Sequence, residues 1–239
     1  MEKLEKLMNI IKESNDIVFF GGAGVSVASG IPDFRGANGL YNYTPEEIIS
    51  HHFFMDHTKE FYDFYWDKMV YKNALPNACH KALAYLEEKG KLRSIITQNI
   101  DGLHQKALSK NVLELHGSVN RNYCMRCHKF YDLSSLETKG IPHCTCGGII
   151  KPDVVLYEEG LDETIITRAI SDISNCDTLI VAGTSLVVYP AASFIRYFRG
   201  KNLIIINLGQ TSYDIYTTLA INGKVEEYLN IDNFKKYNI

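Results

Sequence analysis

The sequence predicts an α/β fold built on a doubly wound, Rossmann-like parallel sheet. Two features lead to this prediction: short apolar runs that are almost continuous, and helical patterns that alternate with them. Strands that are apolar on both faces are typical of parallel sheets covered by helices on each side. With 239 residues, the chain is long enough for a full hydrophobic core and one smaller domain.

The expected elements follow in order along the chain. Apolar residues repeat at helical spacing between positions 4 and 11, and a helix at residues 77–89 ends at Gly90. Further helical patterns cover about residues 162–174 and 190–199. The predicted buried strands are residues 17–20, 92–97, 112–115, 178–182 and 203–206.

Two segments interrupt this alternation. Residues 37–72 are helical and aromatic-rich, and their Thr44-Pro45-Glu46-Glu47 run has the features of a helix start. Residues 119–153 contain four of the six cysteines and little apolar material. We expect these two insertions to form a small domain, with a ligand cleft between it and the main domain. The main domain would consist of residues 1–36, 73–118 and 154–239.

Composition narrows the function classes. The net charge of −3 and the pI near 6.2 give no reason to expect a nucleic-acid partner or a basic membrane-binding face. No apolar run approaches membrane-spanning length, and the N-terminal residues lack the apolar core of a signal peptide. We therefore expect a cytoplasmic protein with reduced thiols, in which clustered cysteines indicate a metal rather than disulfides.

The eight residues from Thr97 to His104 are the most informative stretch. They directly follow a predicted buried strand and read Thr97-Gln98-Asn99-Ile100-Asp101-Gly102-Leu103-His104. Two side-chain amides, a carboxylate and a glycine thus follow directly after the carboxyl end of a strand. Open α/β sheets bind their ligands at this position. The alternative is a turn in which the Asn and Asp side chains only cap the next helix.

A glycine turn, residues 21–26, follows the first strand. Glycines between a strand and a helix let the backbone approach a pyrophosphate, which the helix N-terminus stabilises. This glycine pattern is weaker than the full dinucleotide-binding fingerprint, because Val27 stands where the fingerprint has its third glycine. A glycine turn that serves packing only therefore stays an alternative. Residues 30–36 then place Phe34 and Arg35 beside the expected phosphate site, unless Asp33 and Arg35 form a structural ion pair.

Two close cysteine pairs lie in the second insertion. Four thiolates at this separation satisfy the tetrahedral demand of zinc and predict a zinc ribbon. Such a site is closed and has no open position for water, so its role would be structural. The second pair is tight, which leaves His143 and His128 as alternative ligands. The predicted ligands are Cys124, Cys127, Cys144 and Cys146.

A nucleic-acid-binding ribbon is the competing interpretation of this insertion. Arg121, Arg126 and Lys129 are too few for a convincing phosphate track. The two remaining cysteines, Cys79 and Cys176, occur in helix-like sequence and are expected in the core.

His116 ends the apolar run at residues 112–115 and precedes Gly117. An imidazole at a strand end is a suitable group for proton abstraction near neutral pH. A structural histidine is the alternative. The polar stretch that ends at His104, only twelve residues earlier, favours the catalytic interpretation.

Taken in this order, the motifs resemble those of the sirtuins, the NAD-dependent protein-lysine deacylases, of the bacterial kind. The resemblance extends from about residue 17 to 229. Besides the motifs described above, it includes Gly39-Leu40-Tyr41, Pro152-Asp153-Val154-Val155, Gly183-Thr184-Ser185-Leu186 and Asn207.

The resemblance implies one structural zinc ion and NAD as co-substrate. Pyrophosphate would lie at the glycine turn, Phe34 and Arg35 would line the ribose side, and Asp101 would accept a hydrogen bond from the nicotinamide carboxamide. The implied NAD-binding residues are Gly22, Ala23, Gly24, Phe34, Arg35, Gln98, Asn99, Ile100, Asp101, Gly183, Thr184, Ser185, Asn207 and Leu208.

The implied reaction removes acyl groups from the lysines of proteins or peptides. The acyl oxygen attacks the ribose carbon as nicotinamide leaves, and His116 then acts as general base on a ribose hydroxyl; Asn99 is the second implied catalytic residue. The products are free lysine, nicotinamide and O-acyl-ADP-ribose. The substrate backbone would add as a strand between the stretch at Val187 and Val188 and the stretch Val154, Val155, Leu156 and Tyr157.

Several positions depart from the family pattern. The Cys-x-Cys pair is one residue short, and Glu158 stands where the family usually has glycine. Sirtuins that remove succinyl or malonyl groups bind the acyl carboxylate with a Tyr-x-x-Arg pair, but here Tyr65 occupies the arginine position after Tyr62. We therefore expect neutral acyl substrates, acetyl first, because burying an unpaired carboxylate is costly.

Two other functions remain open at this point. The chain could be a protein ADP-ribosyltransferase, which would deliver the sugar to a protein. It could also be a non-catalytic NAD-binding module, although Asn99, Asp101 and His116 argue against that, since binding alone needs no base. The sequence does not indicate the oligomeric state.

Overall fold

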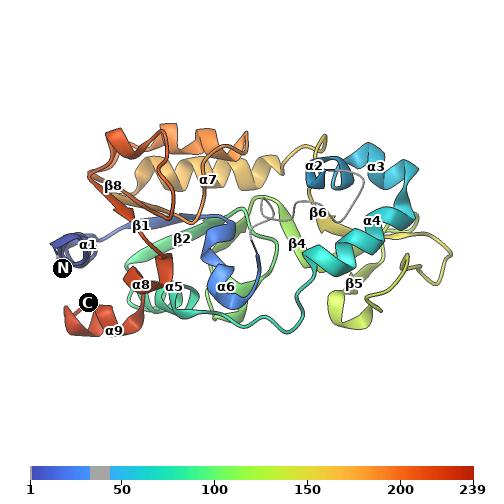
Figure 1. The fold of residues 1–239 in the computed structure, drawn as a ribbon, viewed down its shortest axis with the longest axis horizontal. Coiled ribbons are helices and arrows are strands. Elements are labelled where there is room, and N and C mark those ends of the chain that lie inside the picture. The colour runs from blue at the N-terminus through green and yellow to red at the C-terminus, as the bar shows by residue number, and fades with distance from the viewer. Residues whose placement is uncertain (1, 33–43) are drawn as a thin grey trace.

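A six-stranded parallel sheet forms the centre of the protein (Figure 1). The computed structural model describes residues 2–32 and 44–239. The strand order is β3-β2-β1-β7-β8-β9, so the direction of winding reverses between β1 and β7. The doubly wound, Rossmann-like sheet predicted from the sequence is confirmed. Its strands are β1 (Ile17–Gly21), β2 (Leu92–Thr97), β3 (Val112–Glu114), β7 (Thr178–Ala182), β8 (Asn202–Asn207) and β9 (Leu219–Asn222).

Alternation of side chains along the central strands supplies two hydrophobic cores. Phe19 and Ile180 point to the face that packs against the N-terminal helix, whereas Val18 and Phe20 point to the opposite face. All four side chains are fully buried. The sheet is therefore apolar on both faces, which explains the continuous hydrophobic runs in the sequence.

Helices cover both faces of the sheet. In Figure 1, α7 lies on one side of it and α5 on the other. The helices are α1 (Glu2–Glu13), α5 (Ala78–Glu88), α6 (Leu103–Lys106), α7 (Glu163–Asn175), α8 (Val225–Tyr228) and α9 (Ile231–Lys236). The helical pattern at residues 190–199 corresponds to a 3-10 helix, η6 (Ala191–Tyr197), and a short one, η7 (Asp214–Tyr216), follows β8.

The glycine turn after β1 differs from its prediction. It leads into two three-residue 3-10 turns, η1 (Ala23–Val25) and η2 (Val27–Ser29), rather than into a long α-helix. The turn packs against the loop after β7, where a Cβ atom on Gly24 would lie 2.7 Å from the Cα of Gly183. Close backbone approach, rather than a helix N-terminus, is thus what the glycine provides here.

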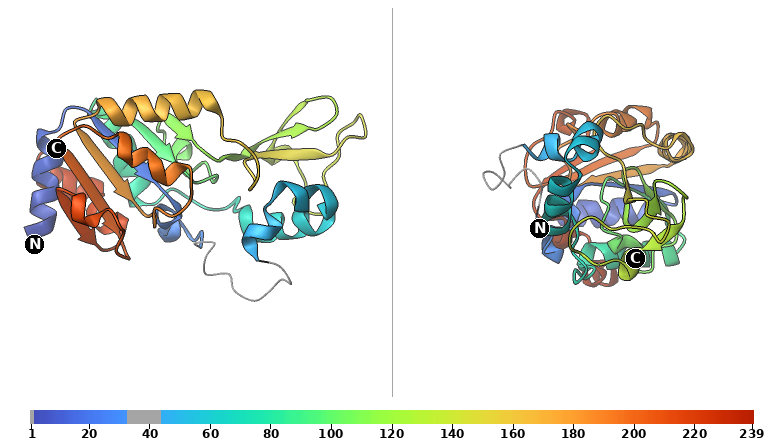
Figure 2. Two further views of the ribbon diagram at one scale, coloured as in Figure 1. Left: turned by 90° about the horizontal axis from the view of Figure 1, so that it is seen from above. Right: turned by 90° about the vertical axis from the view of Figure 1, so that its right-hand side faces the viewer.

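A small three-stranded antiparallel sheet, in the order β5-β4-β6, lies beside the main sheet (Figure 2, left). It consists of β4 (Gly117–Cys124), β5 (Phe130–Asp132) and β6 (Ile150–Val154), with the 3-10 turn η5 (Leu133–Ser135). Its helical neighbours are α2 (Pro45–Ile48), α3 (His51–Asp56), α4 (Thr58–Phe64) and the π-helical turn η4 (Tyr65–Met69).

Aromatic side chains of these helices pack on the small sheet. Phe54, Phe61 and Tyr62 form one buried cluster with Val119 and Val154 of the strands. The two insertions therefore share a core, although the residue boundaries of the two domains stay a prediction. The predicted helix start at Thr44 is confirmed by a reciprocal cap, in which Thr44 and Glu47 bond each other's backbone N–H groups.

Within residues 2–32 and 44–239, no helix has both the length and the apolar composition needed to cross a lipid bilayer.

Candidate active site

A cavity of about 350 Å³ lies at the carboxyl ends of β1, β2 and β7, where the strand order reverses. This is the position at which open α/β sheets bind ligands. The main sheet provides one side of the cavity, and residues of the small domain's helices and of the segment after β6 provide the other. The cavity therefore lies where the sequence predicted a cleft.

Asp101 and Asn99 form a polar cluster with Ser26 in the cavity. The Ser26 hydroxyl donates to Asp101 Oδ2 at 2.6 Å and accepts from the Asn99 side-chain amide at 3.1 Å. The other Asp101 oxygen accepts from the backbone N–H of Leu103 at 2.9 Å. Burial raises the pKa of Asp101, and these hydrogen bonds partly oppose that shift. Gly102, at φ +70°, makes the turn that allows this geometry.

His116 projects from the turn after β3 and also lines the cavity. Its Nδ1 lies 2.9 Å from the backbone carbonyl oxygen of Gln98. A carbonyl can only accept, so Nδ1 carries the proton and Nε2 is left with a lone pair. Burial lowers the pKa of His116, and the bond to Gln98 partly opposes this. The ring is thus held as a neutral imidazole whose basic nitrogen is Nε2.

The segment Val154–Tyr157 runs along the cavity between two anchored backbones. The Val155 N–H donates to the carbonyl oxygen of His116 at 3.0 Å. Tyr157 pairs with the start of α3, since its N–H donates to Ile49 and its carbonyl oxygen accepts from His51, both at 3.0 Å. This extended segment is therefore fixed both to the histidine and to the helical insertion.

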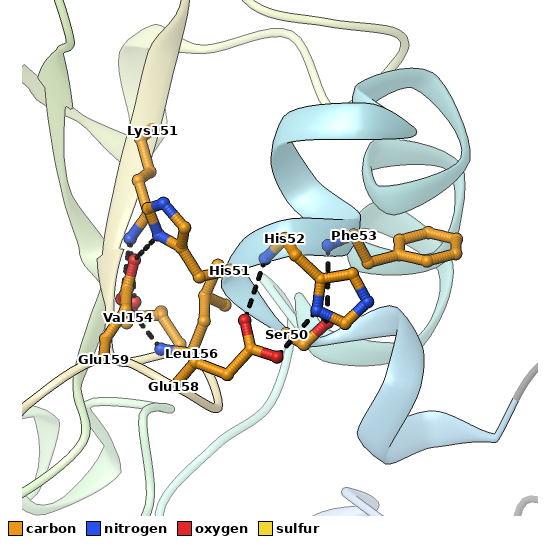
Figure 3. Close-up of polar contacts among 9 residues, drawn as sticks. All are labelled: Ser50, His51, His52, Phe53, Lys151, Val154, Leu156, Glu158 and Glu159. Carbon is orange, nitrogen blue, oxygen red and sulfur yellow. Dashed lines mark hydrogen bonds and ion pairs between the residues drawn. The ribbon is translucent and has the colours of Figure 1, made fainter.

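Two glutamates continue this segment and contact α3 (Figure 3). Glu159 accepts from His51 Nδ1 at 2.9 Å and from Lys151 Nζ at 3.1 Å, and it also accepts from the backbone N–H of Leu156. Glu158 contacts His52. These side chains join the end of β6 to the helical insertion through charged and polar contacts.

The four predicted zinc ligands come together beside the small sheet, where Cys124 ends β4 and the other three lie in the adjoining loops. Their Sγ atoms all lie within 4.8 Å of one another, with neighbouring pairs at 3.5 to 3.6 Å. Tetrahedral Zn–S bonds of about 2.3 Å require sulfur atoms roughly 3.8 Å apart, so the cluster fits zinc. The group that could hold the metal consists of the four cysteines, and neither His143 nor His128 belongs to it.

The basic residues near this cluster are engaged within the protein. Arg121 bonds Glu114 at 2.5 Å and Asp153 at 2.7 Å, and the Arg126 guanidinium donates to the Cys146 carbonyl. These contacts give no support to a phosphate track on the ribbon.

Most of the residues predicted for the site line this one cavity. Gly24, Asn207 and Leu208 are not among the described residues that line it, and Phe34 and Arg35 lie outside the described residues, so their roles stay predictions. The predicted residues that line it are Gly22, Ala23, Gln98, Asn99, Ile100, Asp101, His116, Val154, Val155, Leu156, Tyr157, Gly183, Thr184 and Ser185.

Sequence reasoning missed Ser26, Glu46 and Glu159 as cavity residues. A hydroxyl directly after a glycine turn was the available signal for Ser26. For the two glutamates, no local signal existed, because the packing of the helical insertion against the end of β6 brings them to the cavity.

Comparisons with known proteins agree with this site. The Sir2 family model matches residues 22–190. The protein named NAD-dependent protein deacetylase in Clostridium perfringens (strain 13 / Type A) is 60% identical over 237 residues, which cover 95% of this chain and 97% of the relative. The protein of the same name in Staphylococcus aureus (strain COL) is 48% identical over 226 residues, covering 92% and 93% of the two chains.

Solved structures show the same architecture. A structure described as Sir2, p53 peptide and NAD+ matches with a TM-score of 0.87 at 39% identity and covers 99% of both chains. A Sir2 variant with deacetylated p53 peptide and 3'-O-acetyl ADP ribose matches with a TM-score of 0.87 at 40% identity over 98% of both chains.

The cysteine cluster leads to a metal prediction. Purified protein should contain about one zinc per chain, and Cys144→Ser should lose it, since the hydroxyl is a poor replacement for a thiolate ligand. The midpoint of thermal unfolding should fall, by about 2 to 4 °C for each kcal/mol lost. Elemental analysis and calorimetry measure both. Cys176→Ala, at a buried position away from the cluster, should keep its zinc; full zinc content in Cys144→Ser would contradict the assignment.

Proposed function

This chain belongs to the Sir2 family and is an NAD-dependent protein deacetylase, and we propose that His116 is the general base of its reaction. The observation that carries the proposal is the hydrogen bond from His116 Nδ1 to the Gln98 carbonyl. It leaves Nε2 as the basic nitrogen in a cavity that also contains Asn99 and Asp101. A module that only binds NAD would have no need of a half-buried, neutral imidazole held in this way.

The cavity residues suit the parts of NAD. Asp101 and Asn99 present an acceptor and an amide beside each other, as a nicotinamide carboxamide requires. Gly22 lies so close to the loop after β7 that a Cβ atom would meet the Thr184 side chain at 2.8 Å, which leaves the backbone as the surface for a pyrophosphate. Ser185, Asn207 and Leu208 are assigned to the adenosine half, and Phe34 and Arg35 to the ribose side.

NAD supplies the electrophilic ribose carbon and the nicotinamide leaving group. His116 Nε2 accepts the proton of a ribose hydroxyl, and the Gln98 carbonyl stabilises the imidazolium that results through the Nδ1–H bond. Asn99, which follows the neighbouring strand β2, positions the reacting groups. The reaction yields nicotinamide, free lysine and O-acetyl-ADP-ribose.

Acetylated protein segments are the proposed partners. Homologous Sir2 structures are described with acetylated peptide and with p53 peptide. The extended backbone of Val154–Tyr157, anchored at both ends, supports the addition of a substrate strand between it and the loop with Val187 and Val188. A structural site of four thiolates suits a reducing compartment, so we place the protein in the cytoplasm.

The general base can be tested by substitution. His116→Ala should lower the rate of O-acetyl-ADP-ribose formation by at least about 100-fold, because general bases contribute that much or more. NAD affinity should change little, since the histidine acts on the reacting hydroxyl. Mass spectrometry of the products and titration calorimetry measure the two effects.

His57→Ala, at an exposed histidine of the helical insertion, is the control and should keep full activity. Large loss of NAD affinity in His116→Ala, with the product still formed, would contradict the role. Acid-stable transfer of the sugar to protein would instead identify an ADP-ribosyltransferase.

The pH dependence follows from the lowered pKa of His116. The free base persists below the ordinary histidine value of 6.5, so kcat/KM should hold at pH 6.5 and decline only at lower pH, as the imidazole becomes protonated. A profile of kcat/KM with an acetyl-lysine peptide measures this, with circular dichroism at each pH as the check on folding. An acid limb centred above pH 6.5 would exclude His116 as its source.

Selectivity for the acyl group is a third test. Among the described residues that line the cavity, none is a lysine or an arginine, and Tyr62 and Tyr65 are fully buried in the aromatic cluster. An acyl carboxylate would lack a cation, at a cost of about 3 to 5 kcal/mol. We expect kcat/KM for a succinyl-lysine peptide to be at least about 100-fold below that for the acetyl peptide. Comparable turnover of the two would refute this expectation.

A further inference from the structure

Glu158 has an unusual backbone conformation for its residue type. Its φ angle is +77°, in the left-handed region that glycine adopts freely and other residues adopt at an energetic cost. The residue lies at the edge of the cavity, directly after Tyr157. Backbone strain that persists beside a functional site is a reason to ask what the side chain does there.

The carboxylate of Glu158 is fixed in place by one residue of α3 (Figure 3). One oxygen accepts from the backbone N–H of His52 at 3.1 Å, and the other lies 2.7 Å from His52 Nδ1. These hydrogen bonds lower the pKa of Glu158, so the group is ionised at neutral pH. Half of the side chain is exposed, and each oxygen can still accept another hydrogen bond.

Two of the other described carboxylates that line the cavity are less available to a ligand's cation. Glu159 is occupied by Lys151, His51 and the Leu156 N–H, and Asp101 is half-buried and bonded to Ser26 and to the Leu103 N–H. Glu46, on α2, is exposed. No lysine or arginine is among the described residues that line the cavity, and Glu158 and Glu46 place negative charge on the described part of its rim.

We propose that Glu158 is a specificity-determining residue, which selects substrate peptides that carry a lysine or arginine beside the acetyl-lysine. This rests on the proposed function, because it assumes a peptide along Val154–Tyr157. Glu158 continues that segment, so its charge lies where a residue flanking the acetyl-lysine would pass. The two hydrogen bonds to His52 fix the position of the Glu158 carboxylate before the peptide binds. A lysine or arginine of the peptide can therefore form a charge-assisted hydrogen bond with it, and the Glu158 side chain loses no further conformational freedom.

The test compares three acetyl-lysine peptides that differ only in the flanking residues: arginine, glutamine or glutamate. The unmodified protein should prefer the arginine peptide to the glutamate peptide by about tenfold in kcat/KM at low salt, the size expected for an exposed charge contact made attractive or repulsive. The preference should shrink at about 0.5 M NaCl, where charges are screened. In Glu158→Gln, it should fall to about threefold or less, with Glu46 as the source of the remainder.

A matched variant and a second readout separate the possible outcomes. Glu13→Gln, on α1 at the far end of the molecule from α3 (Figure 1), should keep the full preference. Affinity for the same peptides, measured by fluorescence anisotropy, reports the preference without turnover. A protein that binds peptides with this preference but releases no nicotinamide would therefore refute the proposed function alone.

If Glu158→Gln kept the full preference for the arginine peptide over the glutamate peptide, the proposal would be overturned. Glu158→Gly distinguishes selection from a structural link to α3. Glycine suits the left-handed backbone, so this variant should unfold at a similar or higher temperature while losing the peptide preference. A large drop in the unfolding temperature with the preference intact would assign the His52 contact a purely structural role and overturn the proposal as well.

Discussion

The hydrogen bond between His116 Nδ1 and the Gln98 carbonyl is the interaction on which the rest of the site depends. It follows from the register of two parallel strands, because Thr97 of β2 pairs with Glu114 of β3. Both residues of the bond lie just beyond the ends of these strands, and the Leu115 N–H bond to Thr97 extends the pairing to them. The imidazole is therefore oriented by the pairing of β2 with β3.

The polar cluster of Ser26, Asn99 and Asp101 in the same cavity is held by a different constraint. Ser26, Asn99 and Asp101 come from two turns that are distant in the sequence, and each would be costly to bury alone. Their mutual hydrogen bonds satisfy them, provided that the turn after β1 lies close to the end of β2. That closeness depends on parallel pairing of β1 with β2, and on the tight contact of the glycine turn with the loop after β7.

Local sequence patterns predicted what local physics determines. The strands at the centre of the sheet are buried on both faces, so their continuous apolar runs allowed them to be predicted from the sequence. In contrast, β9 (Leu219–Asn222) is a four-residue edge strand without such a long apolar run, and it was not predicted. The cysteine pairs could be predicted from the sequence, because the two cysteines of each pair are close in the chain and lie near each other whatever the rest of the fold. The contacts of His52 and Glu158 could not, since they arise where the helical insertion meets the end of β6.

The zinc cluster lies away from the cavity, yet the two are connected through one pair of strands. At one end of the β4–β6 pair, Cys124 is aligned with Ile150; at the other, Gly117 is aligned with Val154. A metal at the first end would hold the register of the stretch from Asn122 to Cys124, because a slip by one residue would turn side chains to the wrong face; an irregularity between Ser118 and Asn122 separates this stretch from the other end. Arg121 adds a second tie between β4 and Asp153 of β6. The cysteine cluster and the backbone that follows Val154 beside His116 thus lie at opposite ends of one strand pair, which Arg121 ties together between them.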